Sequence, residues 1–175
     1  MSKVLSTTRR RFMGTTVAGA ALAPLALATG ARAEQSAMTY EIVRSEEEWR
    51  SMLSEDEFHI LREGGTENQY TSPLASDFSE GTFHCKGCDL TLYSSRWRED
   101  VDKGWVFFRH GEPDTLLMTI DGPQEAYDQP ALDSLTNIEC HCRRCGSHMG
   151  HILNINNVVL HCINGTALTF TATEA

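Results

Sequence analysis

Apolar residues at helical spacing mark the segment 46–63, where Trp49 and Leu53 lie four residues apart. Ser54 is followed three residues later by Glu57, the capping-box pattern that marks the start of a helix. The sequence therefore predicts two short helices that meet at Ser54, the second ended by a pair of glycines.

Beyond these helices the pattern changes to short runs rich in β-branched and aromatic residues, separated by Gly, Asp and Asn. The expected strands are 82–84, 90–93, 104–108, 116–120, 138–140, 158–162 and 167–170. We interpret the polar segment 66–80 as an extended loop, 121–123 as a turn and 127–134 as a polar connection. The predicted fold class is mainly β, a small antiparallel β core with short N-terminal helices.

The first 33 residues have the pattern of a cleaved signal peptide. Five basic residues and no acidic one accompany an apolar run through Ala28 and a small-x-small site ending at Ala33. Arg9 and Arg10 form the twin-arginine signature, which directs a folded protein to export. The apolar run is short for a membrane span and contains a proline, which disfavours a permanent anchor.

This leader sets the expected domain organisation and location. We expect 1–33 to be a twin-arginine signal peptide, 34–45 a linker and 46–175 the catalytic domain, in the periplasm without stable membrane anchoring after cleavage. The mature chain would keep 10 of the 15 basic residues against 24 acidic ones, a formal charge of −14. A charge of that sign repels phosphate backbones, so nucleic acid is not an expected partner.

Four cysteines form two CxxC pairs, Cys85/Cys88 and Cys142/Cys145. Two tight turns that aim their sulfurs at one point satisfy tetrahedral zinc, and Gly87 and Gly146 beside the pairs permit positive φ angles there. We expect one structural Zn²⁺ per chain, loaded before export. The alternatives are two disulfides or a thioredoxin-like redox pair, although neither pair precedes a helical pattern.

Cys162 belongs to neither pair and ends a β-rich run. The simplest reading of such a cysteine is a small apolar core residue. However, His161 is adjacent, and His148 and His151 directly follow the second metal-binding turn, which would fix their positions. Because a nearby imidazolium lowers the pKa of a thiol, Cys162 is the candidate nucleophile.

Several further motifs accompany the two CxxC pairs: Gly65-Thr66-Glu67, Leu92-Tyr93-Ser94-Ser95, Gly104-Trp105, Cys145-Gly-Ser-His148-Met-Gly-His151 and Cys162-Ile-Asn164. These motifs occur in the order found in methionine sulfoxide reductase B, the family that acts on the R epimer. The sequence therefore resembles this family over nearly the whole mature chain. The resemblance implies a zinc-stapled β fold and reduction of methionine-R-sulfoxide, free or in proteins.

The resemblance also implies the roles of individual residues. Cys162 matches the nucleophile that attacks the sulfoxide sulfur and becomes a sulfenic acid. His148 and His151 match the pair that orients the substrate and protonates its oxygen, and Asn164 matches a polar active-site residue. Trp105 matches the aromatic wall beside the substrate's methyl group. A thioredoxin-like or other thiol would then act as the reductant.

The sequence departs from the family's pattern around the nucleophile. Lys103 stands where the family often has a resolving cysteine, which leaves Cys140 as a possible resolving thiol. The alternative is that Cys140 is an inert strand residue and that an outside thiol reduces the sulfenic acid. Leu160 replaces an arginine whose charge helps to ionise the thiol, and His161 replaces a tyrosine. The candidates to substitute for the missing charge are His161 and the arginines at 143 and 144; without such a substitute, activation of the thiol is lost.

Two other functions remain open at this point. The run Cys140–Cys145 also resembles that of glutathione-dependent formaldehyde-activating proteins, which suggests a glutathione-linked enzyme on a related zinc-bearing β fold. The loss of the arginine before Cys162 suggests a zinc-stabilised binding module without catalysis.

Overall fold

A computed structural model describes residues 39–121 and 137–174. The chain divides into two compact units, 1–37 and 38–175, and the described residues all belong to the second. The expected leader, the start of the expected linker and the polar connection at 127–134 lie outside the described residues. Of the expected turn at 121–123, only Asp121 is described, as the last residue of a strand.

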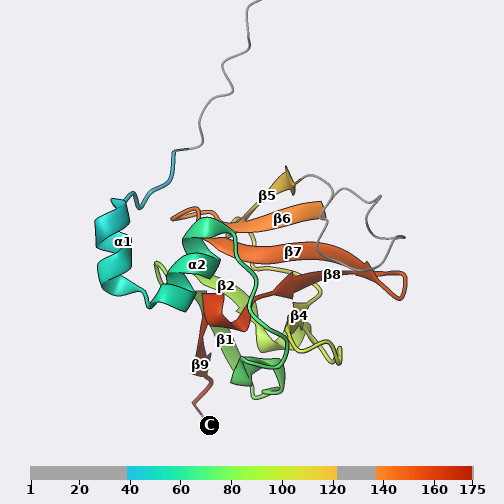
Figure 1. The fold of residues 1–175 in the computed structure, drawn as a ribbon. Coiled ribbons are helices and arrows are strands. Elements are labelled where there is room, and N and C mark those ends of the chain that lie inside the picture. The colour runs from blue at the N-terminus through green and yellow to red at the C-terminus, as the bar shows by residue number, and fades with distance from the viewer. Residues whose placement is uncertain (1–38, 122–136, 175) are drawn as a thin grey trace, which may run out of the picture. The chain divides into compact units, whose positions relative to one another are not determined.

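Two short helices come first, α1 (Glu46–Met52) and α2 (Glu55–Glu63), as Figure 1 shows. The predicted capping box is present, since Ser54 accepts from the Glu57 N–H and Glu57 bonds back to the Ser54 N–H. Ser45 caps α1 in the same way, and Gly64 ends α2 with a left-handed φ of 72°. The described residues contain no helix that is long and apolar enough to cross a membrane.

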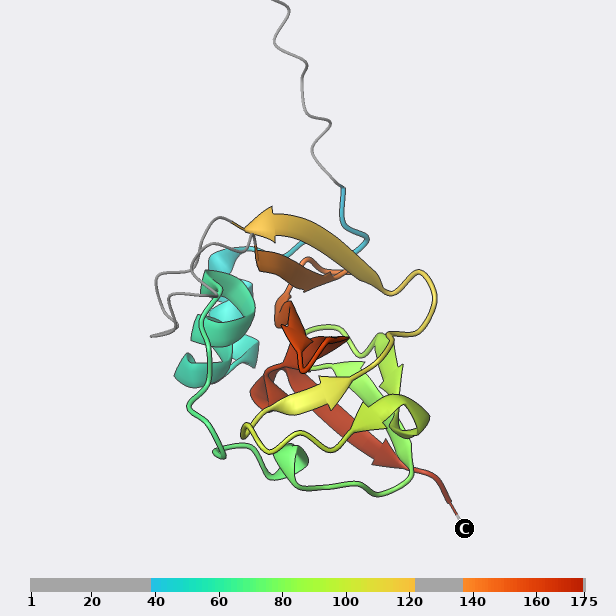
Figure 2. The ribbon, with the colours of Figure 1, turned by 90° about the vertical axis from the view of Figure 1, so that its right-hand side faces the viewer.

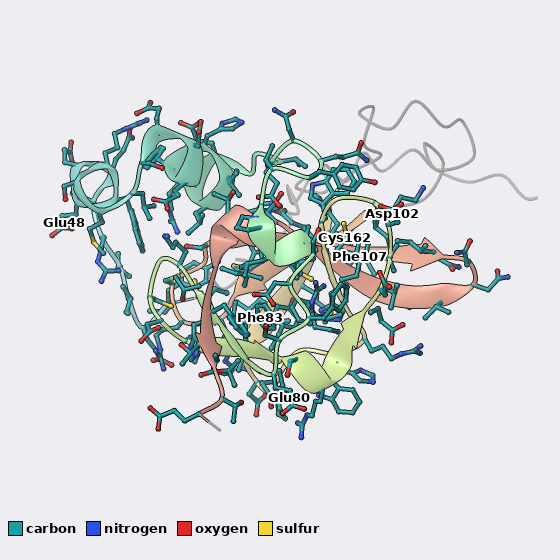
Figure 3. All side chains as sticks on the ribbon, turned by 90° about the horizontal axis from the view of Figure 1, so that it is seen from below. Glu48, Glu80, Phe83, Asp102, Phe107 and Cys162 are labelled. Atoms are coloured by element: carbon teal, nitrogen blue, oxygen red, sulfur yellow. The ribbon has the colours of Figure 1, made fainter. Side chains whose placement is uncertain are left out.

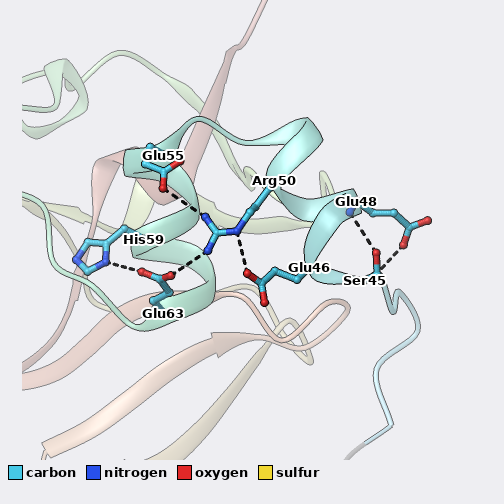
Figure 4. A network of polar contacts seen from close by, with 7 residues as sticks. All are labelled: Ser45, Glu46, Glu48, Arg50, Glu55, His59 and Glu63. Atoms are coloured by element: carbon cyan, nitrogen blue, oxygen red, sulfur yellow. Dashed lines mark hydrogen bonds and ion pairs between the residues drawn. The ribbon is translucent and has the colours of Figure 1, made fainter.

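The two helices are joined on their outer side by Arg50 (Figure 4). Its guanidinium forms ion pairs with Glu46, Glu55 and Glu63 and lies over the ring of Phe58, 3.7 Å from the ring centroid. Exposed pairs of this kind contribute little to stability individually. The network orients the helices, while their apolar sides hold them on the domain.

The strands are β1 (Gly81–Cys85), β2 (Thr91–Ser94), β3 (Arg98–Glu99), β4 (Val106–Phe108), β5 (Leu116–Asp121), β6 (Asn137–Cys142), β7 (His148–Ile155), β8 (Val158–Ile163) and β9 (Leu168–Ala172). They form two antiparallel sheets, ordered β2-β1-β9 and β3-β4-β8-β7-β6-β5. Single 3₁₀ turns lie at η1 (Pro73–Ala75), η2 (Ser95–Trp97) and η3 (Gly165–Ala167). The predicted fold class is confirmed, whereas β3 and the long strand β7 were not predicted.

The main hydrophobic core combines residues of both helices and both sheets. Figure 2 shows the two helices on one side of the strands. At its centre the ring of Phe108 stacks on Tyr93 at 4.2 Å and meets Phe83 edge-on at 5.0 Å. A second, smaller cluster consists of Phe107, Leu160 and Cys162. Because successive strand residues point to opposite faces, this cluster lies on the other side of the six-stranded sheet from Phe108.

Candidate functional site

The four cysteines of the CxxC pairs form one cluster. Their sulfur atoms all lie within 4.8 Å of one another, with Cys85 and Cys145 3.7 Å apart and Cys88 and Cys142 3.5 Å apart. Zinc–sulfur bonds of about 2.3 Å in a tetrahedron place sulfurs about 3.8 Å apart, so the cluster fits such an ion. None of the six cysteines is joined in a disulfide in this structure, and the arrangement of four sulfurs around one point favours a metal site over two disulfides.

The turns that carry these sulfurs depend on residues beside them. In the first turn the Asp89 N–H donates to the Cys85 carbonyl at 2.8 Å, and Asp89 itself has a φ of 60°. In the second turn Gly146 has a φ of 70°, as expected. The expectation that Gly87 also has a positive φ is wrong. Gly87 is needed for space, because a Cβ there would lie 2.9 Å from Ser147 Oγ.

Hydrogen bonds support a thiolate at Cys145. The neighbouring thiols, Cys142 first, lower the pKa of Cys145, and the Ser147 hydroxyl 3.2 Å from its sulfur acts in the same direction. Arg62 of α2 donates to both the Ser147 oxygen and the Cys145 carbonyl at 3.2 Å. The helix is therefore tied to the metal-binding turn.

Cys162 lies on β8, in the interior of the six-stranded sheet. It pairs directly with His151 of β7 and with Phe107 of β4, and His151 in turn pairs with Glu139 of β6. Residues directly opposite each other on paired strands share a face. Glu139, His151, Cys162 and Phe107 thus form one row across the sheet, and Figure 3 shows Cys162 and Phe107 side by side.

A β-bulge brings His148 onto the same face as His151. The two histidines are three residues apart, a separation that places side chains on opposite faces of a regular strand. Here Cys140 pairs with Gly150, but the next β6 residue, His141, pairs with His148, so β7 has one extra residue. The imidazole rings of His148 and His151 consequently lie 5.3 Å apart.

Gly150 makes this bulge possible. Its φ of 149° is one that L side chains rarely adopt, and a Cβ there would lie 2.1 Å from the carbonyl oxygen of Cys162. The glycine in the family-like His-Met-Gly-His run therefore allows close approach of β7 to β8, the strand of Cys162.

His148 is buried and held by a carboxylate. Its Nδ1 lies 2.5 Å from Glu139 Oε1, and the other Glu139 oxygen lies 3.2 Å from His141 Nε2. Burial lowers the pKa of His148, while the contact with Glu139 opposes this effect. Its buried Nε2 has no hydrogen-bond partner among the residues that the structure describes. A neutral His148 that donates from Nδ1 would keep Nε2 as a free acceptor.

The surroundings of Cys162 are apolar. Leu160, at the position of the family's arginine, lies on the same face two residues away and pairs with Leu153. Burial first, and then the charges of Glu67 and Cys140, raise the pKa of the Cys162 thiol to about 12. The structure thus has apolar packing where a positive charge was expected to ionise the thiol.

A cavity of about 570 Å³ opens beside Cys162. Trp105 and Phe107 line it with the thiol, and its rims are formed by residues 100–103 and 153–156. Figure 3 shows Asp102 on this side of the molecule. The volume lies in the range of small-molecule sites, and the mix of apolar walls with polar rims is typical of them. Lys103, which replaces the expected resolving cysteine, stands at this rim.

Two further predicted site residues lie beside the nucleophile's strand and are fixed by backbone groups. Asn164 is buried, accepts from the Glu67 N–H at 3.1 Å and donates to the Met149 carbonyl at 3.2 Å. The indole N–H of Trp105 donates to the Glu67 carbonyl at 3.2 Å. Both ends of the Asn164 amide are therefore engaged within the protein.

The residues expected to replace the arginine do not face the thiol. His161 points to the opposite face of β8, where its Nδ1 lies 3.2 Å from the Tyr93 hydroxyl, and burial lowers the pKa of this histidine. Arg143 and Arg144 form ion pairs with Asp114 and Glu41. None of the three takes the place of the missing arginine.

Cys140, the possible resolving thiol, belongs to the main core. It is fully buried, pairs with Gly150 and Met118, and lies on the opposite face of β6 from Glu139. Burial raises the pKa of its thiol to about 12. The burial of Cys140 in the main core favours an inert core residue over a resolving thiol.

The fold and site define a small β protein with a four-thiolate metal-binding cluster and a separate cavity lined by a free thiol. A family model described as the SelR domain matches residues 53–172 of this chain. The chain belongs to this family, that of the methionine sulfoxide reductase B enzymes.

Named relatives occur in plants and bacteria. Peptide methionine sulfoxide reductase B3 of Arabidopsis thaliana is 32% identical over 135 residues, which are 74% of this chain and 70% of the relative. The chloroplastic reductase B2 of the same plant is 34% identical over 73% of this chain and 60% of its own length. Peptide methionine sulfoxide reductase MsrB of Leptospira interrogans is 29% identical over 76% of this chain and 98% of its own.

Two carboxylates in the site, the buried Glu67 and the partly buried Glu139, were not assigned roles from the sequence. Glu139 contacts His148, and Glu67 contacts the chain that follows Cys162. Alternation along a strand could have placed Glu139 opposite His151 only if the register of β6 and β7 had been known. Glu67 lies in the Gly-Thr-Glu motif, but the motif alone does not show which groups it binds.

Proposed function

We propose that this protein reduces methionine-R-sulfoxide, free or within proteins, to methionine, with Cys162 as the nucleophile. The observation that carries the proposal is the position of Cys162, in the wall of a partly apolar cavity beside Trp105 and in register with His151. The names of the relatives support the same reaction.

The sulfur of Cys162 attacks the sulfoxide sulfur, and the oxygen passes from the substrate to the cysteine. The substrate sulfur is reduced to the thioether, and the cysteine sulfur is oxidised to a sulfenic acid. The thiol proton ends on the transferred oxygen, so atoms and electrons balance. Two further thiols then return the sulfenic acid to Cys162, with formation of one disulfide and one water.

Proton movement must accompany this attack, because the raised pKa of Cys162 keeps it protonated at neutral pH. His151 is the imidazole in direct register with the thiol and can take its proton as the sulfur attacks. His148, held by Glu139, lies next to His151 and completes a short proton path. The proton taken from Cys162 can then neutralise the negative charge that develops on the sulfoxide oxygen.

Trp105 supplies the wall against which the substrate's methyl group packs, with its indole N–H fixed by Glu67. Phe107 continues that apolar surface next to Cys162. Asn164 holds backbone groups of the site in place, since its side-chain amide accepts from the Glu67 N–H and donates to the Met149 carbonyl.

The metal that we propose for the four-cysteine cluster is one structural Zn²⁺ per chain. Four thiolates at tetrahedral spacing leave no open position for a substrate, so the ion would stabilise the fold and fix the turn before His148.

An outside thiol, such as a thioredoxin-like protein, is the proposed reductant. Cys140 is enclosed in the core, and Lys103 occupies the cavity rim where a resolving cysteine is expected. The sulfenic acid on Cys162 would instead be reached through the open cavity.

We further propose that the protein is exported to the periplasm and repairs oxidised proteins there. The support is the sequence of residues 1–33, with its paired arginines, apolar run and small-residue cleavage site. Mass spectrometry of the periplasmic fraction should find a chain that begins at Glu34.

Turnover of the separate R and S epimers of a methionine sulfoxide peptide, with dithiothreitol as reductant, tests the proposed function. We expect reduction of the R epimer alone, in a sample that holds one zinc per chain. Zinc-loaded protein that reduces neither epimer would reject the proposal and favour a glutathione-linked enzyme or a non-catalytic binding module.

Glu139→Gln should lower kcat/KM for the R epimer by about tenfold or more, because a positioned proton path contributes roughly 10²–10⁴-fold to catalysis. The amide can still accept from His148 Nδ1, but it loses the charge that favours protonated His148. The pKa of His148 should therefore fall, and the acidic limb of the pH profile should move to lower pH. An unchanged profile would show that Glu139 has only a packing role. Glu80→Gln, which makes the same change at an exposed site, is the matched control.

A further inference from the structure

The connection that follows α2 holds two walls of the site together. Glu67 is buried there, and its backbone N–H donates to Asn164 Oδ1 while its carbonyl accepts from Trp105 Nε1. Asn164 follows the nucleophile by two residues, and Trp105 begins the wall of the cavity. Glu67 thus bonds both to a residue that lines the cavity and to the chain that follows Cys162.

The side-chain carboxylate of Glu67 also binds the chain that follows Cys162. One carboxylate oxygen accepts from the Gly165 N–H at 2.6 Å, and the other accepts from the Thr166 N–H at 2.8 Å and the Thr166 hydroxyl at 2.6 Å. These N–H groups begin η3, where the backbone has no partners of its own. Glu67 therefore caps η3 from a distant part of the chain.

The cap that Glu67 provides explains why the Asn164 side chain bonds to Glu67 and Met149. Asparagine at an N-cap usually bonds its own helix start, yet Asn164 makes no side-chain cap hydrogen bond. Its amide instead joins Glu67 to the Met149 carbonyl. The Glu67 carboxylate takes over the capping role, which frees Asn164 to connect the loop to β7.

Three neutral groups donate to the Glu67 carboxylate, the N–H groups of Gly165 and Thr166 and the Thr166 hydroxyl. The charge of this carboxylate raises the pKa of Cys162 and so opposes formation of the attacking thiolate. The charge of Glu67 therefore disfavours the thiolate. A carboxylate at this position is explained if the hydrogen bonds that it accepts favour the reaction by more than its charge disfavours it.

We propose that Glu67 is a positioning residue that fixes Trp105 and the chain after Cys162 relative to each other and so sets the affinity for the sulfoxide. The proposal rests on the proposed function, since Trp105 is taken as the substrate's wall. We call Glu67 with Trp105, Asn164, Gly165 and Thr166 the Glu67 clasp.

Glu67→Gln tests the Glu67 clasp, because it keeps the shape but places an NH₂ group against donors. We expect KM for a methionine-R-sulfoxide peptide to rise at least about tenfold, since hydrogen bonds to a charged group are lost, while kcat changes less. The pKa of Cys162, measured from its alkylation rate against pH by mass spectrometry, should fall. Glu80→Gln, at an exposed position, should change neither quantity.

The alkylation readout reports on the charge of Glu67. Within the described part of the chain, the ionisable groups around Cys162 are Glu67, Cys140, His151 and, along the cavity, Asp100, Asp102 and Lys103. Only Glu67 changes in the variant. A KM and a thiol pKa equal to those of the wild type would overturn the proposal.

Thr166→Val provides a second test if Glu67→Gln loses its zinc or unfolds. It removes one hydroxyl donor from the Glu67 clasp and leaves the charge in place. KM should rise by about threefold or more, since a charge-assisted hydrogen bond is lost, with no change in the pKa of Cys162. An unchanged KM would contradict the Glu67 clasp. Wild-type turnover in the same series tests the proposed function separately.

Discussion

Cys162→Ser should reduce turnover of methionine-R-sulfoxide by about 10³-fold or more, because no other group can take the oxygen. A serine hydroxyl cannot form a sulfenic acid, and Cys162 is the cysteine that lines the cavity. The zinc content and the melting temperature should stay near those of the wild type, since Cys162 lies apart from the metal-binding cluster. Steady-state kinetics and metal analysis on one sample measure both.

Cys140→Ser is the matched control for this substitution. Both variants replace a buried cysteine on the same sheet, but Cys140 faces the main core. Its activity with dithiothreitol should remain close to that of the wild type. Turnover retained by Cys162→Ser would remove Cys162 from its role, and a clear loss in Cys140→Ser would make Cys140 the resolving thiol.

Cys85→Ser or Cys142→Ser should release the zinc and unfold the domain. Structural zinc supplies about 10 kcal/mol or more of folding free energy, comparable with the whole stability of a small domain. Both cysteines are also part of the main hydrophobic core, so no solvent can replace the lost ligand bond. Circular dichroism with metal analysis measures the effect.

Treatment of the wild type with a strong chelator should produce the same unfolded state as these substitutions. A Cys85→Ser protein that remains folded without metal would show that the four thiols are held by packing alone. It would also show that the position of His148 does not depend on a bound metal.

The local parts of the fold were predictable because their signals are short in sequence. The capping box at Ser54 places the boundary between the helices, and the two CxxC pairs identify the metal-binding cluster. Alternating apolar runs predicted most strands of both sheets. Each of these signals depends on residues a few positions apart.

The geometry of the site depends on pairing between distant strands, which the sequence does not display. The strand β7 was missed because its residues include glycine, histidine and asparagine, so its pattern lacks the usual alternation. The β-bulge beside Gly150, which turns His148 toward His151, is visible only in the register of β6 and β7. His161 was expected to assist Cys162, but strand alternation directs it to Tyr93.

Activation of the Cys162 thiol cannot use the arginine that the family commonly has. The family's arginine is replaced by Leu160, and the structure shows no cation in its place among the described residues. In the proposed mechanism, attack by this thiol is therefore coupled to proton transfer within the bound complex, with His151 as the acceptor in register. Slow alkylation of the free enzyme at neutral pH together with fast turnover would agree with this account.

A single turnover without reductant tests the central claim most directly. Reduced protein is mixed with excess methionine-R-sulfoxide peptide, trapped with a reagent specific for sulfenic acids and examined by peptide mass spectrometry. The account predicts one methionine formed per protein and a trapped sulfenic acid on Cys162, with Cys140 and the four metal-binding cysteines unmodified. Methionine formed without modification of Cys162, or a sulfenic acid on another cysteine, would contradict it.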